Sequence, residues 1–151
     1  MKVENKNLLL YCARKSVGEV SLAGAKCESE ENVYFAIGTA VHWLMDGIDR
    51  IPKNLIKQEH VKMFSAIRYV NNCLKHNATF KEAHKIEGLD YPFDYPFDYG
   101  AHYIWVPTEN IEISEKNKKQ KENYDAELKW KNVYKTLSDI LKVVEEYYSE
   151  F

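Results

Sequence analysis

Apolar residues recur every three or four positions in several segments of the chain, the spacing that places them on one face of a helix. The clearest segment is 30–49, where the apolar face consists of Val33, Ile37, Val41, Leu44 and Ile48. Ser-Glu-Glu at 29–31 supplies an N-cap and early negative charge, which both favour a helix start. Pro52 then ends the segment. This stretch therefore predicts an amphipathic helix with one buried face.

Three further segments show the same spacing. Helices are predicted over about 6–24, 57–77 and 120–150. In the last of these, apolar residues alternate steps of four and three, as in a bundle seam: Ala126, Trp130, Val133, Leu137, Ile140, Val144 and Tyr147. Together the segments predict an all-α fold, a four- to five-helix up-down bundle.

Residues 88–113 interrupt the helical pattern. They contain a tandem Asp-Tyr-Pro-Phe at 90–97, and proline at every fourth position excludes a helix there. Residues 101–106, Ala-His-Tyr-Ile-Trp-Val, are typical of a short strand, so a short hairpin is one option. Since so many aromatic side chains favour burial, we expect an ordered, aromatic, Pro-containing insert before the last helix. The whole chain, 1–151, is then one domain.

Composition narrows the function classes. The net charge of −2 supplies no global field for nucleic acid or membrane, and no segment has the length of apolar residues that a membrane span needs. The three cysteines are widely spaced and fit neither a disulfide framework nor a zinc site, so we expect a reducing cytoplasm. The N-terminal residues lack the features of a signal peptide. No cofactor-binding or metal-binding motif is present in the sequence, so neither is expected.

Charge is divided along the chain. Between Ile86 and Glu115 there are seven acidic residues and no lysine or arginine. Residues 57–85 instead hold six basic and two acidic residues, a local charge of +4. This basic half gives mild support to an anionic partner such as RNA or a nucleotide. The alternatives are an ordinary solvated helix face, which is the more common explanation, or a basic face that the acidic insert neutralises.

The predicted third helix carries an unusual polar strip. On a helical wheel Arg68, Asn72 and His76 lie along one edge of the buried face, and Asn71 and Lys75 flank them. A histidine there is a candidate general acid or base, and the arginine is a candidate phosphate ligand. The flanking lysine and asparagine are candidate RNA contacts. The alternative is structural: Asn72 and His76 cap the helix end and bond the following loop.

A helical bundle whose third helix ends in Asn-x-x-x-His resembles the HEPN superfamily. Its usual motif is an arginine, four to six residues and a histidine, with a polar residue directly after the arginine. In "NNCLKH", Asn72 matches the polar position and His76 the histidine. The chain departs from the motif at Asn71, which occupies the arginine position, while Arg68 lies one turn earlier.

The resemblance implies a small dimeric helical domain. Many members are metal-independent ribonucleases of toxin–antitoxin or phage-defence systems. If their chemistry carries over, the ribose 2′-OH attacks the phosphate, His76 moves the proton, and Arg68 or another arginine steadies the charge. With Asn71 in the motif, an attenuated ribonuclease or an RNA-binding protein is expected. The alternative is a non-catalytic, dimeric protein-interaction domain that meets a protein partner through the acidic aromatic insert.

Overall fold

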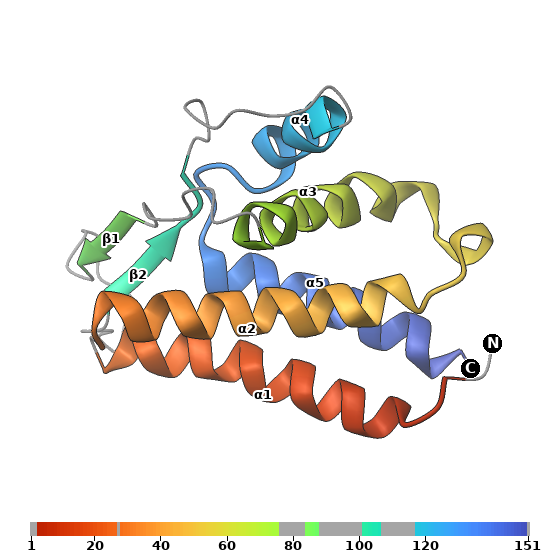
Figure 1. The fold of residues 1–151 in the computed structure, drawn as a ribbon, viewed down its shortest axis with the longest axis horizontal. Helices are drawn as coiled ribbons and strands as arrows, with labels where there is room; N and C mark the ends of the chain where they lie inside the picture. Colours follow the sequence, from red (N-terminus) through yellow and green to blue (C-terminus); the bar gives the residue numbers. More distant parts are fainter. Residues whose placement is uncertain (1–2, 27, 76–83, 88–100, 107–116, 151) are drawn as a thin grey trace, which may run out of the picture.

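The structure is a computed structural model that describes residues 3–26, 28–75, 84–87, 101–106 and 117–150. These residues contain the following elements: α1 (Lys6–Ala25), α2 (Glu30–Asp49), the 3-10 helix η1 (Lys53–Leu55), α3 (Gln58–Lys75), β1 (His84–Glu87), β2 (Ala101–Ile104), α4 (Lys118–Glu127) and α5 (Val133–Ser149). The predicted all-α bundle is confirmed (Figure 1).

The helices α1 and α2 form an antiparallel pair, and α5 packs against both (Figure 1). The N-cap predicted for α2 is confirmed, because the Ser29 hydroxyl accepts a hydrogen bond from the Asn32 backbone N–H at 3.3 Å. Helix α3 packs on α2, and α4 covers the outer side of α3. The two strands lie at the end of the bundle where α1 ends and α5 begins (Figure 1).

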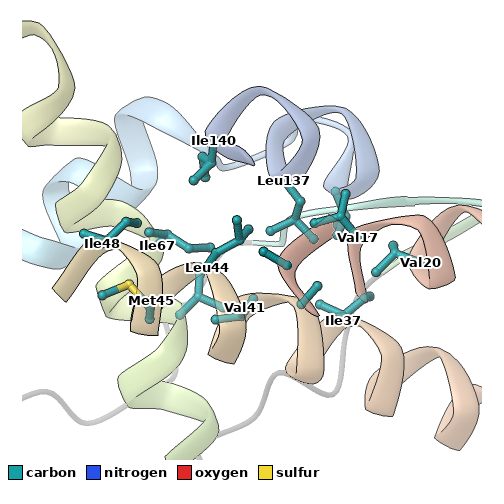
Figure 2. Packing of buried hydrophobic residues seen from close by; sticks show 14 of the residues in the cluster. Val17, Val20, Ile37, Val41, Leu44, Met45, Ile48, Ile67, Leu137 and Ile140 are labelled. Atoms are coloured by element: carbon teal, nitrogen blue, oxygen red, sulfur yellow. The ribbon is translucent and has the colours of Figure 1, made fainter. Parts of the chain in front are cut away.

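The core sits where α2 meets its neighbours. Side chains from α1, α2, α3 and α5 converge there (Figure 2), and these are at most 3% exposed: Val17, Ile37, Val41, Leu44, Ile48, Ile67, Leu137 and Ile140. The closest approach is at Gly47, where an added Cβ would lie 3.3 Å from Val144 Cγ1 and 3.4 Å from Leu9 Cδ2. A glycine at this position lets α1 and α5 both reach the α2 backbone.

The predicted continuous helix over 120–150 is wrong, since the chain breaks into α4 and α5. Trp130 adopts a left-handed conformation with φ 66°, and the Asn132 side chain caps α5 by accepting the Lys135 N–H at 2.9 Å. The apolar spacing stays in phase across this turn, so periodicity alone gives no sign of it. The turn is tied to the chain after β2, because the Trp130 N–H donates to the Trp105 carbonyl at 2.8 Å.

The strand predicted within 101–106 is confirmed over Ala101–Ile104. It pairs antiparallel with β1, so that Ile86 lies opposite His102. Trp105 follows β2 and is 1% exposed, with its indole N–H donating to the Thr136 hydroxyl at 2.6 Å. This part of the predicted insert is therefore packed on the bundle. Its remaining residues, 88–100 and 107–113, lie outside the described residues.

Candidate functional site

The polar strip predicted on the third helix lies on α3 beside its buried face. Phe64, Ile67 and Val70 are at most 4% exposed and face the core. Arg68 and Asn72 are one turn apart at the edge of that face, and both are partly exposed. The strip thus forms as the helical pattern predicts, up to the end of α3 at Lys75. His76, the candidate proton-transfer group, lies outside the described residues.

Arg68 points from α3 toward the end of α2. Its Nη2 donates to Asp49 Oδ1 at 2.5 Å, and the two side chains are 39% and 53% exposed. An exposed ion pair of this kind contributes at most about 1 kcal/mol to stability. The guanidinium is therefore engaged within the chain, by a contact weak enough for a stronger anion to displace.

Asn72 points the other way, toward α4. Its amide Nδ2 donates to Gln120 Oε1 at 3.0 Å. Two turns earlier on the same face, Ser65 Oγ accepts a hydrogen bond from Asn123 Nδ2 at 2.9 Å, and Asn123 is only 6% exposed. These two bonds form a polar seam between α3 and α4. Buried amides need such partners, since an unsatisfied one is costly, so the seam accounts for polar residues on this side of α3.

The two residues that flank the strip, Asn71 and Lys75, lie on different sides of α3. Asn71 is 8% exposed and lies on the buried side of α3, whereas Lys75 is exposed to solvent. Of the candidate site residues that the structure describes, Arg68 and Asn72 share an edge but bind different helices. Only Lys75 projects freely outward at the end of α3.

Burial shapes the two titratable groups nearest the seam. Desolvation by burial raises the pKa of the Cys73 thiol. It also raises the pKa of the Tyr124 phenol, and charge on Cys73 would raise that pKa further. Tyr124 stacks obliquely on Tyr69 with ring centroids 5.3 Å apart. Both groups stay neutral at physiological pH, so neither supplies a ready nucleophile or base.

A second candidate surface was not predicted from the sequence. On the outer side of α1, three apolar side chains are exposed: Leu8 (64%), Tyr11 (57%) and Leu22 (48%). Phe35 of α2 is 73% exposed and lines a shallow groove between α1 and α2 together with Lys15 and Glu19. The signal is present in the sequence, because positions 8, 11, 15, 18 and 22 step by three and four. This spacing defines an outer stripe opposite the buried face of α1.

Among the described residues, no three His, Cys, Asp or Glu side chains gather as a metal site would require. No described helix is both long and apolar enough to cross a membrane. Comparison of the chain with protein-family models, curated proteins and solved structures gave no match. The resemblance to the HEPN superfamily therefore rests on the Asn72–His76 pattern and the order of helices alone.

Proposed function

We propose that this chain is a non-catalytic interaction domain in which the outer stripe of α1 pairs with the same stripe of a second copy. The observation that carries the proposal is the exposure of Leu8, Tyr11 and Leu22 on one side of α1, with Phe35 exposed on the neighbouring helix α2. Exposed apolar side chains aligned on one face of a helix mark interaction surfaces more often than scattered ones do. Hydration of these side chains is unfavourable, and a second copy removes it.

The dimensions of the face suit a small, reversible interface. A helix of 20 residues is about 30 Å long. Together with α2 at its side, the face is about 20 Å wide, because packed helices lie about 10 Å apart. The product is a footprint of about 600 Å², smaller than the roughly 800 Å² per partner that a standard interface buries. We therefore expect a reversible dimer with a dissociation constant on the order of micromolar.

Charge at the two ends of the stripe sets the direction of pairing. Glu4 precedes α1 and Lys26 follows it, and both are exposed at the ends of the outer stripe. Antiparallel pairing places each glutamate beside the lysine of the second copy, and Leu8 opposite Leu22. Parallel pairing would place like charges together at both ends. The antiparallel arrangement is therefore favoured, with a two-fold axis near Lys15.

At that axis two copies of Lys15 approach each other. Glu19 lies one turn further along the same side of α1, and it lines the groove together with Lys15 and Phe35. Each lysine therefore has a glutamate of the second copy within one helical turn, which offsets the repulsion. Gly18 leaves open space on the stripe, since an added Cβ would meet no atom within 4 Å, so the second helix can approach closely there.

Sedimentation velocity over a concentration series up to about 100 µM tests the proposal, a range that covers micromolar affinity. The wild type should shift from monomer to dimer. Leu22→Lys should raise the dissociation constant roughly tenfold or more, because two apolar contacts are lost per dimer. Leu55→Lys is the matched control: Leu55 is 43% exposed but lies in η1, away from the stripe. A monomeric wild type, or an equal effect of both variants, would overturn the proposal.

A second candidate function is an RNA-acting domain of the HEPN type, active or attenuated. The observation that favours it is the common edge of α3 shared by Arg68 and Asn72, which are both partly exposed. The weak Arg68–Asp49 pair leaves the arginine available to a phosphate. Lys75 at the end of α3 would add positive charge to such a site. A ribonuclease assay of the His76→Ala variant tests this candidate separately from dimerisation.

A further inference from the structure

A pocket of about 480 Å³ opens at the end of the bundle where β2 packs against α1 and α5. This size falls within the range of small-molecule sites, roughly 300–1,000 Å³. β2, the end of α1 and the start of α5 supply its lining, and these three elements lie together at one end of the fold (Figure 1). The pocket lies away from the α3 strip and borders the C-terminal end of the outer stripe of α1, since Ser21 and Ala25 flank Leu22.

The wall formed by α1 and β2 is largely apolar. Val20 and Gly24 of α1 and Tyr103 of β2 line it, and all three are buried. His102, the neighbour of Tyr103 on the strand, also borders the pocket. This wall suits the carbon skeleton of a ligand rather than a bare ion.

The wall formed by α5 is polar and charged. Lys135, Ser138, Asp139 and Lys142 line it, and steps of three and four place them on one face of the helix. Ser21 of α1 faces the same space. In the described part of the chain, no ion pair within 4.0 Å joins the Asp139 carboxylate to Lys135 or Lys142. Two ammonium groups and one carboxylate thus line one pocket, with each lysine one helical turn from Asp139.

We propose that this pocket binds a small phosphate monoester on a hydroxylated carbon skeleton. The ammonium groups of Lys135 and Lys142, on long flexible stems, hold the phosphate by charge-assisted hydrogen bonds. Asp139 is an acceptor for the hydroxyl groups of the skeleton, as a carboxylate is for a ribose. Ser138 and Ser21 each add a hydroxyl that both donates and accepts.

The carboxylate of Asp139 determines whether the pocket prefers inorganic phosphate or a phosphate ester that carries hydroxyl groups. For inorganic phosphate, Asp139 is a repulsive neighbour that weakens binding. For a sugar phosphate, the same group accepts hydrogen bonds from hydroxyls and adds to affinity. Sugar phosphates and mononucleotides both carry a phosphate and neighbouring hydroxyl groups, and a mononucleotide carries a nucleobase in addition.

The test is a titration of the ¹⁵N-labelled full chain, followed by NMR, with ribose 5-phosphate, adenosine monophosphate and inorganic phosphate as separate probes. Ribose 5-phosphate should shift amide signals of the pocket elements saturably and bind more tightly than inorganic phosphate. Lys142→Ala should weaken it about fivefold, the effect of one exposed charge contact. Lys62→Ala, an exposed lysine on α3, is the matched control and should leave affinity unchanged.

Asp139→Asn separates the two roles of the carboxylate. The proposal predicts that inorganic phosphate binds more tightly to this variant, while the preference for ribose 5-phosphate over inorganic phosphate shrinks. Tighter binding of adenosine monophosphate than of ribose 5-phosphate assigns the site to a mononucleotide, and equal binding assigns it to a sugar phosphate. Absence of saturable shifts at the pocket, or inorganic phosphate binding as well as ribose 5-phosphate to the wild type, would overturn the proposal.

Discussion

Replacing Tyr124 by phenylalanine removes a single hydroxyl from the junction of α4 with the chain after β2. Tyr124 is 2% exposed, and its hydroxyl donates to the Val106 carbonyl at 2.5 Å. Its ring packs against Tyr69 at 5.3 Å and Trp105 at 6.4 Å between centroids. Phenylalanine keeps these ring contacts, so the substitution isolates the hydrogen bond that ties α4 to residues 105 and 106.

The expected loss follows from what the hydroxyl leaves behind. Val106 is 8% exposed, so its carbonyl has little access to water as a substitute donor. Leaving a buried acceptor unsatisfied costs about 1–3 kcal/mol, and we expect about 2 kcal/mol at this site. With a urea m-value of about 2 kcal/mol/M, the unfolding midpoint should fall by about 1 M. The melting temperature should fall by about 4–8 °C for a chain of this length.

Urea unfolding followed by circular dichroism measures this difference. Tyr134→Phe is the matched control, because Tyr134 is 42% exposed and its hydroxyl can bond water. We expect the control to stay within about 0.5 kcal/mol of the wild type, as surface substitutions usually do. If Tyr124→Phe also stays within that range, the hydroxyl–carbonyl bond does not hold α4 in place and the reasoning fails.

The remaining predictions concern single sites. Trp130→Gly should have an unfolding free energy about 1 kcal/mol higher than Trp130→Ala in urea melts, because both lose the indole and only glycine adopts φ 66° without strain; a lower value for glycine would contradict this. Burial raises the pKa of Tyr148 to about 12. Since the unfolded pKa is about 10, this stabilisation is complete below about pH 10 and is lost as pH rises through the folded pKa. Tyr148→Phe should therefore flatten the alkaline fall in stability by up to about 1.4 kcal/mol per pH unit, and an unchanged slope would refute it. The RNA-acting candidate predicts ribonuclease activity that His76→Ala abolishes, and equal background in both proteins would reject it. Arg68→Ala should cost less than about 1 kcal/mol of stability, as its exposed pair with Asp49 implies, and a larger loss would show a stronger contact.

The sequence predicts a helix accurately where a regular apolar spacing coincides with a residue that marks the helix end. The helix predicted over 30–49 matches α2, because Ser29 provides the cap and the apolar face is regular. The predictions over 6–24 and 57–77 differ by one residue from the end of α1 and from the start of α3, and the predicted end at 77 lies outside the described residues. Such differences are normal, since helix ends depend on capping details that the apolar pattern does not carry.

The last helix shows where periodicity fails. Trp130 continues the apolar spacing, yet it is 56% exposed and sits in the turn. The apolar spacing over 120–150 gave no reason to interpret Asn132 as a helix start, although asparagine is a good N-cap residue and α5 begins directly after it. A cap inside an apparently continuous helix is decided by tertiary contacts, here the backbone bonds between Trp105 and the residues at 130 and 131.

For the candidate site on α3, the sequence predicts which side chains share one edge of the helix but not which residues they contact. Helical geometry places Arg68 and Asn72 on one edge of α3 whatever surrounds them. Their partners, Asp49 on α2 and Gln120 on α4, come from helices whose packing no local pattern gives. The exposed stripe on α1 was missed because the buried face of the same helix satisfies the amphipathic pattern, and a second apolar spacing then goes unnoticed.

Sedimentation equilibrium of four proteins tests the self-pairing of α1 most directly: the wild type, Glu4→Lys, Lys26→Glu, and the double variant that exchanges both charges. Antiparallel pairing predicts that each single variant dimerises more weakly than the wild type, because like charges then meet at both ends of the stripe. The double variant should recover wild-type affinity, since every glutamate again faces a lysine. A wild type that remains monomeric, or a double variant weaker than both single ones, would contradict the account.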